Sequence, residues 1–345
     1  MADPVRTRFR HFVESSAHRA PLYSRISRAL ADWPVLDDLL ADAPDPARVP
    51  VNLLAAVHYL LLADPSHPLA RFYPNLAGGA VDSGDPVPEF LAFCADHATE
   101  LRELVATRLP QTNEIGRAPV LVAGFGQLPP GPRAHLDVGA SAGLNLMLDR
   151  LAYTDGHGVL GSSEVVLECS VRPEGRRLAD GLPEIASRLG LDANPLDLTD
   201  PDDARWLEAC VWPDQADRFV RLQRAIALFL ADPVPVRRGD AVAGLASAVA
   251  ELGDGTPVIT TTWMLCYLEP GRQREFAGVV EALGAQRDLD WVWAESPFIV
   301  EVLPLPPDLV GNDATVLGYS SWRNGRRTDR ALATCHPHGY WLTWR

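Results

Sequence analysis

The segment 135–146, HLDVGASAGLNL, has residues whose types and spacing can do chemistry. An apolar run enters a tight turn that includes Gly139, Ser141 and Gly143, and a helical pattern follows over 143–151. Such a strand, turn and helix present backbone N–H groups that can hold an anion or the polar end of a cofactor. The same residues spell G-x-S-x-G, the turn that carries the nucleophilic serine of many hydrolases. Cofactor binding and hydrolysis by Ser141 are therefore competing interpretations.

Polar groups at the ends of candidate strands favour cofactor binding. In a doubly wound sheet the ligand lies at the carboxyl ends of the strands. The first candidate strand ends in Asp137 and the glycine turn, the second runs into Asp192, and the third ends next to Asp240. Asp192 can accept hydrogen bonds from ribose hydroxyls, and Asp240 can accept one from an adenine amino group. The fourth candidate strand ends in Thr262 and Trp263.

A polar string, QTNEIGR (111–117), lies just before the first strand, where it can fold over the strand ends. Arg117 can pair with a cofactor carboxylate through a bidentate contact, and Glu114 can serve as a base or a substrate ligand. Asn113 is a further candidate cofactor contact. The structural alternative is a capped helix start, in which Thr112 or Asn113 accepts a backbone N–H.

The string CHPH (335–338) places two imidazoles on a turn near the C-terminus. His338 is a candidate general base that faces the substrate, and an ordinary β-turn is the alternative. Zinc needs three or four ligands at compatible spacing, and no partner cluster is visible in the sequence. We therefore predict no metal site.

Element patterns predict an α/β protein with a helical N-terminal cap and a Rossmann-like, mostly parallel sheet that ends in an antiparallel β-meander. Residues 1–117 form the helical region, and residues 118–345 form the α/β domain with an inserted β-hairpin near 154–183. The predicted parallel strands are 134–138, 185–191, 234–238, 258–262 and 289–294. The predicted meander strands are 315–322, 328–334 and 340–344.

Composition excludes several classes of protein. All 31 basic residues are arginine, so Schiff-base or pyridoxal lysines and Walker-A phosphate loops are excluded. The formal net charge of −14 argues against nucleic acid and anionic membranes as partners. No apolar run is long enough to span a membrane, and the N-terminal residues lack the apolar stretch of a secretory signal. Five widely spaced cysteines with no C-x-x-C pair indicate a reducing compartment, so we expect a cytoplasmic protein.

The strand ends and glycine turn resemble the class I S-adenosylmethionine-dependent methyltransferase fold over about residues 118–345. The resemblance implies that Gly139, Ser141 and Gly143 lie under the methionine portion of the cofactor. It also implies that Asp137 faces the amino group, Asp192 the ribose and Asp240 the adenine. The interval from Gly143 to Asp192 is 49 residues, against roughly 20 in a compact βαβ unit. If the inserted hairpin does not explain this excess, Glu168 is the alternative ribose ligand.

Over longer stretches the chain resembles an uncharacterised bacterial family, the domain of unknown function numbered 2332. The strings that carry this resemblance are NLLAAVHYLLL (52–62), QTNEIGR (111–117), LDVGASAGLNL (136–146), LDANPLDLTDPDDARWLEACVWPDQ (191–215), RRGD (237–240) and HPHG (336–339). This resemblance brings no known activity.

The predicted function is methyl transfer from S-adenosylmethionine to an unidentified small molecule, with Glu114 and His338 as candidates for the group that removes the acceptor's proton. One alternative is a serine hydrolase that combines Ser141 with an acid such as Asp288 and either His336 or His338. Another is a cofactor-binding protein without catalysis. The sequence does not indicate the acceptor or the oligomeric state.

Overall fold

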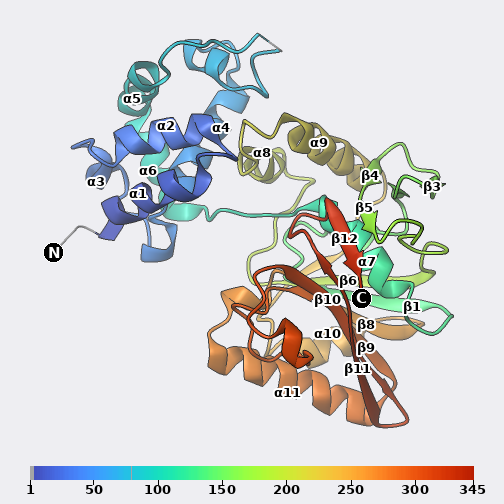
Figure 1. Cartoon of the computed structure of the whole chain (residues 1–345). Helices are drawn as coiled ribbons and strands as arrows, with labels where there is room; N and C mark the ends of the chain where they lie inside the picture. The colour runs from blue at the N-terminus through green and yellow to red at the C-terminus, as the bar shows by residue number, and fades with distance from the viewer. Residues whose placement is uncertain (1–3, 79) are drawn as a thin grey trace. The chain divides into compact units, whose positions relative to one another are not determined.

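The computed structural model describes residues 4–78 and 80–345, and the chain divides into two compact units (Figure 1). The helical unit comprises the chain up to Thr112 together with 197–224, and the sheet unit comprises 113–196 together with 225–345. Residues 197–224 thus group with the N-terminal helices, although the sequence analysis assigned them to the second domain.

The helical unit is built from amphipathic segments whose apolar stripes face one another. Its helices are α1 (Pro4–Ser16), α2 (Pro21–Leu30), α3 (Leu36–Leu39), α4 (Pro50–Ala63), α5 (Val87–Asp96), α6 (Ala98–Thr107), α8 (Pro201–Ala209) and the first part of α9 (Ala216–Ala231). Helix α8 packs on α4. Two polar contacts of α8 with the N-terminal helical segments explain why residues 197–224 belong to the helical unit. The indole of Trp206 donates to the Leu109 carbonyl (2.9 Å), and the buried His58 ring lies 3.0 Å from the Ala209 carbonyl.

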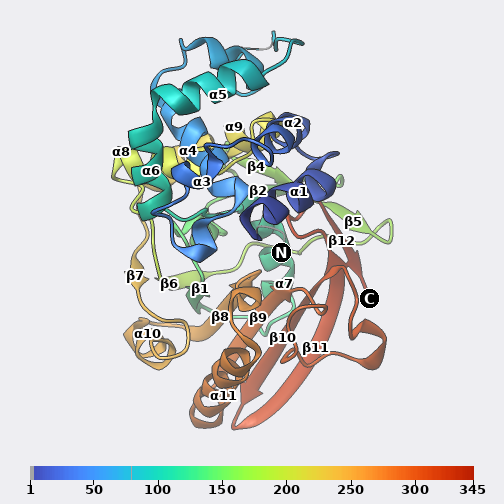
Figure 2. The same ribbon diagram turned by 90° about the vertical axis from the view of Figure 1, so that its left-hand side faces the viewer.

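The sheet unit contains one large mixed sheet, which has nine strands within the described residues. Its order is β7-β6-β1-β8-β9-β10-β11-β12-β5. The strands are β1 (Arg133–Val138), β5 (Ser170–Arg172), β6 (Ile185–Asp192), β7 (Val236–Arg238), β8 (Thr256–Thr262), β9 (Leu289–Glu295), β10 (Thr315–Arg323), β11 (Arg326–Cys335) and β12 (Trp341–Trp344). Strands β7, β6, β1, β8 and β9 are parallel neighbours, so their carboxyl ends share one edge. The strand order reverses at β1, because β6 and β7 lie on one side of it and β8 on the other (Figure 2).

The predicted parallel strands and the meander are confirmed, and no strand boundary differs from its predicted position by more than two residues. Strands β10, β11 and β12 pair antiparallel in chain order, and β10 pairs antiparallel with β9. Side chains alternate between the two faces along β1, and all six of its residues are buried, so both faces of the sheet are covered there.

Helices cover both faces of this sheet. Helix α7 (Ala118–Phe125) packs on one face, where the Phe125 and His135 rings meet edge to face at 5.2 Å. Helices α10 (Leu245–Glu251) and α11 (Pro270–Gln286) pack on the other face, where Phe276 meets Trp291 at 5.7 Å. The parallel strands are therefore enclosed between helices, as a sheet of continuous apolar strands requires.

The insertion is more elaborate than the predicted hairpin. Strands β2 (Ala152–Thr154), β3 (Val159–Leu160) and β4 (Val166–Glu168) form a separate small sheet, in which β2 pairs antiparallel with β3 and parallel with β4. The next strand, β5, leaves this small sheet and pairs with β12 at the edge of the large one. The sequence did not indicate this long-range pairing, because strands of three residues carry little pattern.

The helix predicted over 143–151 is wrong, because the glycine turn is followed by a single 3₁₀ turn, Leu144–Met147. Two side chains donate hydrogen bonds to backbone carbonyl groups that would accept N–H groups of the same segment in an α-helix. Arg188 donates to the Leu146 carbonyl (2.7 Å), and the Tyr153 hydroxyl donates to the Leu148 carbonyl (2.5 Å). These bonds hold the chain in turns until β2 begins.

No helix among the described residues combines the length and the apolar character needed to cross a membrane.

Two glycines of α11 test the packing of this helix. A Cβ on Gly284 would overlap the indole of Trp322, whereas a Cβ on the exposed Gly278 meets nothing within 4 Å. We expect Gly284→Ala to lower the free energy of unfolding by about 1–3 kcal/mol because of overpacking. Gly278→Ala should raise it by about 0.5–1 kcal/mol through helix propensity. Urea unfolding followed by tryptophan fluorescence measures both, and equal effects of the two variants would contradict the packing.

Candidate functional site

The glycine turn follows β1 directly, and its backbone conformation depends on small residues. Gly139, Ser141 and Gly143 have φ of +78°, +54° and +84°. A Cβ on Gly139 would overlap the side chain of Met264, and one on Gly143 would lie 2.7 Å from Val236 Cγ2. The turn is thus held between the loop that follows β8 and the start of β7, and glycine is required by both conformation and space.

Asp192, at the end of β6, organises this turn. Its Oδ2 accepts the Ser141 N–H (2.8 Å), and its Oδ1 accepts the Asn194 N–H (2.8 Å). The carbonyl of Asp192 also accepts the N–H of Gly239, just after β7 (2.8 Å). The predicted site loops after β1, β6 and β7 are therefore brought together by direct hydrogen bonds.

Asp240 lies beside these loops but has structural partners of its own. Its Oδ1 accepts the N–H groups of Val242 (2.9 Å) and Ala243 (2.8 Å) and pairs with the Arg272 guanidinium at 2.6 Å. The hydrogen bond from Ala243, together with Arg272, lowers the pKa of this exposed carboxyl. Asp240 therefore caps the turn that leads into α10.

Glu168 lies elsewhere. It ends β4 in the small sheet, whereas Asp192 ends β6, the direct neighbour of β1. The inserted strands lie within the interval of 49 residues from Gly143 to Asp192 and account for its length. Glu168 belongs to this insertion and ends a strand of the small sheet, so it is not in the loops that follow β1, β6 and β7.

Asp137 is buried near the end of β1 (2% exposed) and accepts a hydrogen bond from the Thr260 hydroxyl of β8 (2.7 Å). Burial raises its pKa to about 7, and the charge of Asp192 acts in the same direction. The Thr260 hydrogen bond and the charge of Arg117 oppose this rise. Asp137 is thus a carboxyl whose ionisation responds to nearby charge at neutral pH.

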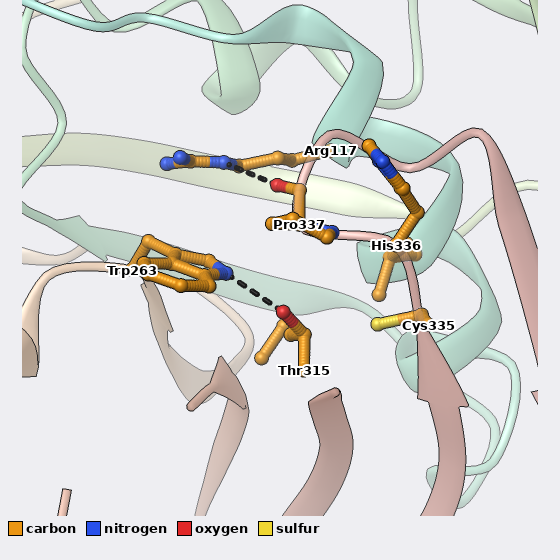
Figure 3. Close-up of a pocket in the computed structure, with 8 residues that line it drawn as sticks. Arg117, Trp263, Thr315, Cys335, His336 and Pro337 are labelled. Carbon is orange, nitrogen blue, oxygen red and sulfur yellow. Dashed lines mark hydrogen bonds between the residues drawn. The ribbon is translucent and has the colours of Figure 1, made fainter. Parts of the chain in front are cut away.

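Arg117 lies over the same edge of the sheet and is fixed by backbone carbonyls. Its Nε donates to the Pro337 carbonyl (3.1 Å), and its Nη1 donates to the Thr262 carbonyl at the end of β8 (2.9 Å). Figure 3 shows the first of these bonds and the Arg117 side chain above the ring of Trp263. Arg117 and Trp263 line a cavity of about 10 Å³, which has room for about one water molecule.

The sequence analysis missed Glu295 and named Trp263 only as the end of the fourth candidate strand. Glu295 ends β9, is fully buried, and accepts the N–H groups of Met264 (3.1 Å) and Leu265 (3.3 Å). Burial raises its pKa to about 7, while these hydrogen bonds and Arg117 lower it.

Trp263 has φ of +53°, a strained conformation for a large side chain, and its indole donates to the Thr315 hydroxyl (2.9 Å). Glu295 fixes the turn immediately after Trp263. A rule that polar residues follow parallel strands would have found Glu295, since the fifth predicted strand ends just before it.

Glu114 and His338, the two candidate bases, are brought together. Glu114 Oε2 and His338 Nδ1 lie 3.6 Å apart, and the side chains are 1% and 25% exposed. Glu114 Oε1 accepts the Gly116 N–H (2.9 Å), while the Asn113 side chain accepts the Leu144 N–H (2.9 Å) at the exit of the glycine turn. Asn113 thus accepts a backbone N–H at the start of a short 3₁₀ turn, which is close to the structural alternative, a capped helix start.

The turn 336–339 packs backbone to backbone against 114–117. A Cβ on Gly339, whose φ is +73°, would overlap the Gly116 carbonyl, and one on Gly116 would lie 2.5 Å from the His338 carbonyl. His336 Nδ1 accepts the His338 N–H (3.0 Å), which fixes the turn internally. Two strings far apart in the sequence therefore form one substructure.

The arrangement can hold opposite charges and move a proton. Arg117 and Asp137 offer a fixed cation and a titratable anion beside the glycine turn, and Glu114 with His338 forms a carboxylate–imidazole pair. Among the described residues no group of three or more His, Cys, Asp or Glu side chains has an arrangement that could hold a metal ion. Asp288 precedes β9 and so lies at the opposite edge from Ser141, where it accepts the Asn324 N–H (2.9 Å). The triad with Asp288 is therefore not formed.

Comparison with known proteins identifies the family. A family model described as an uncharacterized protein conserved in bacteria (DUF2332) matches residues 6–344, so the chain belongs to this family. Searches of the curated proteins and of the solved structures found no significant match.

Gly339 and Gly325 give a matched test of the contact between the two strings. Both have φ near +72°, but a Cβ on Gly325 would have only the Ala285 carbonyl nearby, at 3.8 Å. Both alanine variants carry the conformational strain of positive φ, about 1 kcal/mol or more, and only Gly339→Ala adds the overlap with Gly116. We expect Gly339→Ala to lower the free energy of unfolding by about 2 kcal/mol more than Gly325→Ala. Thermal unfolding measures the difference, and equal losses would argue against the close approach.

Asp137→Asn tests the buried carboxyl. The folded-state pKa of about 7 lies above the unfolded value, so Asp137 stabilises the fold fully below about pH 4 and loses this contribution as the pH rises through 7. Asparagine keeps an oxygen for the Thr260 hydroxyl but carries no charge. The stability of the variant relative to the natural chain should therefore increase between pH 5 and pH 8, by on the order of 3 kcal/mol.

Asp290→Asn is the control for that measurement. Asp290 is also fully buried, but it pairs with Arg133 (3.2 Å) and Arg323 (2.7 Å), so its neutralisation should destabilise the fold at pH 8. Urea titrations at each pH measure both variants. A pH-independent difference for Asp137→Asn would contradict the raised pKa.

Proposed function

We propose that the sheet unit binds S-adenosylmethionine and transfers its methyl group to a small molecule. The observation that carries this proposal is that a fixed arginine, Arg117, and a buried carboxyl that senses its charge, Asp137, both lie at the edge of the sheet where β1 ends in the glycine turn. The parallel strands run in the order third, second, first, fourth, fifth, which resembles the Rossmann-like sheet of class I methyltransferases and supports a ligand at the point where the order reverses.

The residues present fit the amino-acid end of this cofactor. An α-carboxylate suits the planar guanidinium of Arg117, whose orientation is fixed by two backbone carbonyls. An α-ammonium suits Asp137, whose carboxyl becomes an anion at neutral pH when a cation approaches. The side chains of Met264 and Val236 pack directly against Gly139 and Gly143 and so fix the backbone of the glycine turn.

The adenosyl end is assigned to the loops after β6 and β7. Each oxygen of Asp192 already accepts one backbone N–H, and a carboxylate oxygen has two lone pairs, so acceptor capacity is left for ribose hydroxyls. Asp240, one strand further, is exposed and is assigned to the adenine edge.

When bound, S-adenosylmethionine supplies a methyl group that is already activated for transfer. The chain then has to align donor and acceptor, exclude water and remove a proton from the acceptor where one is present. Arg117 and Asp137 fix one end of the donor. Glu295 fixes the turn after Trp263 and so keeps one wall of the site in place. His338 and Glu114 are the groups available to take a proton.

Calorimetric titration with S-adenosylhomocysteine tests the proposal. The natural chain should bind it, and Asp192→Ala should weaken binding at least roughly tenfold, because one or two charge-assisted hydrogen bonds are lost. Asp254→Ala is the control, since Asp254 is exposed and precedes β8 at the opposite edge of the sheet. Unchanged affinity in Asp192→Ala would remove the ribose assignment, and no binding by the natural chain would remove the function. Thermal-shift comparison with NAD and ATP tests the choice of cofactor.

Serine hydrolysis is the second candidate function. The positive φ of Ser141 matches the strained turn of a nucleophile elbow, and His338 with Glu114 offers a base and an acid. Ser141 is only 3% exposed and its N–H bonds Asp192, so it ranks below methyl transfer. Labelling of the natural chain, but not of Ser141→Ala, by a fluorophosphonate probe would reverse this ranking.

A further inference from the structure

We propose that His135 and Thr260 are positioning residues for Asp137, and that their hydrogen bonds favour the anionic form of this carboxyl, which then selects a ligand with an ammonium group. The choice of ligand rests on the proposed function, because Asp137 is the carboxyl assigned to the α-ammonium of S-adenosylmethionine. His135 and Thr260 are both fully buried, so they act through Asp137 and not by contact with a ligand.

Strand geometry brings the three side chains together. His135 and Asp137 are two residues apart on β1, so their side chains lie on the same face of the sheet. Thr260 is the direct partner of Asp137 on the neighbouring strand β8. Its hydroxyl lies 2.9 Å from His135 Nε2 and donates to Asp137 Oδ1 at 2.7 Å, whereas the Leu136 carbonyl is 3.5 Å away. The three groups thus form one chain of hydrogen bonds that runs toward the carboxyl edge of the sheet.

The number of protons in this chain sets its direction. Burial lowers the pKa of His135 to about 3, and the charge of Arg188 acts in the same direction, so the ring is neutral and carries one proton. A proton on Nε2 bonds the Thr260 oxygen and leaves the hydroxyl proton for Asp137. A proton on Nδ1 would be a buried donor without an acceptor, because Nδ1 has no hydrogen-bond partner among the residues that the structure describes. The chain therefore donates from His135 through Thr260 to Asp137.

This donation opposes the effect of burial on Asp137. Burial raises the pKa of Asp137 to about 7, and the hydrogen bond from Thr260 lowers it. The charge of Asp192, at the end of β6, raises this pKa, and the charge of Arg117 lowers it. Helix α7, whose Phe125 meets the imidazole edge to face, has no charged residue in its sequence, APVLVAGF. The chain of hydrogen bonds thus keeps a buried carboxyl close to ionisation at neutral pH.

A carboxyl in this state distinguishes ligands by their charge. A hydrogen bond to the anionic form lowers the free energy of that form. An ammonium group beside Asp137 gains a charge-assisted hydrogen bond to the anion, whereas a neutral group gains less and an anion is repelled. Without the Thr260 hydroxyl more of the protein is protonated at Asp137, and a cationic ligand has to displace that proton. His135 and Thr260 therefore contribute to the preference for an ammonium group.

NMR spectroscopy of the ligand-free full chain tests the chain of hydrogen bonds. With ¹⁵N-labelled histidine, the His135 ring should be neutral at pH 6 and carry its proton on Nε2. Loss of these signals in His135→Gln, or in His135→Asn, assigns them. With ¹³C-labelled aspartate, the carboxyl signal that is lost in Asp137→Asn should titrate with a pKa of about 7. Thr260→Val should raise this midpoint by roughly one pH unit, and Thr260→Ser should restore it.

Thr261→Val is the matched control. Thr261 is also fully buried and follows Thr260 on β8, so it faces the other side of the sheet, where its hydroxyl accepts the indole N–H of Trp291 (3.1 Å). Loss of this hydroxyl should leave the midpoint of Asp137 unchanged. A His135 proton on Nδ1 in the natural chain, or the same midpoint in Thr260→Val as in Thr261→Val, would overturn the proposal.

Titration with S-adenosylhomocysteine tests the choice of ligand. A rise of one pH unit in the midpoint lowers the ionised fraction of Asp137 at pH 7 from about one half to about one tenth, so Thr260→Val should bind about fivefold more weakly than Thr261→Val. At pH 8.5 both variants are mostly ionised, and the difference should fall below about twofold. The analogue of S-adenosylhomocysteine without the α-amino group should bind both variants equally.

The pH profile separates the proposed role from a loss of structure. A fivefold difference that persists at pH 8.5, or that appears equally with the analogue, would overturn the selection of an ammonium group. No binding by the natural chain would remove the proposed cofactor together with this ligand. The NMR measurements use no ligand, so they decide the roles of His135 and Thr260 separately from the proposed function.

Discussion

The position of Arg117 is the constraint on which the site depends. Its guanidinium donates to the carbonyl that ends β8 and to the carbonyl of Pro337 in the histidine turn. These two acceptors belong to segments that meet only through tertiary structure. The planar fork of arginine can bond both carbonyls at once and still present a charged face to the strand ends, which an ammonium group on a flexible stem does not do.

The sheet unit also buries groups that are costly to ionise. Burial raises the pKa of Asp137 and Glu295 to about 7, and burial lowers the pKa of His135 to about 3. These three side chains contribute little to stability as charges, and the sheet and its helices are held largely by apolar packing. The cluster around Trp291, Trp293 and Phe276 supplies that packing. The site thus resembles many functional sites, where local rules are broken and compensated elsewhere.

The strands and glycine turn could be predicted because their signals are local. Alternating or continuous apolar runs indicate strands, and parallel strands align their carboxyl ends, so Asp137 and Asp192 could be placed near each other before any coordinates. The helix after the turn could not be excluded, because Arg188 and Tyr153 act on it from distant positions. The contact of Gly116 with Gly339 could not be predicted from the sequence either. Two glycines in separate strings carry no information about their partner. Glu114 and His338 were candidates because of the polar string before the first strand and the two imidazoles on a turn.

The histidine turn has a consequence for biosynthesis. Arg117 and Pro337 are 220 residues apart in the chain, and the strand that follows the turn, β12, pairs with β5 from the insertion. A ribosome adds residues from the N-terminus, so most of the sheet can form before this turn leaves the exit tunnel. Arg117 then lacks one of its two carbonyl acceptors, and Glu114 has no imidazole opposite it. The contact between segments 114–117 and 336–339 therefore forms late, after the strands that precede this turn have been synthesised.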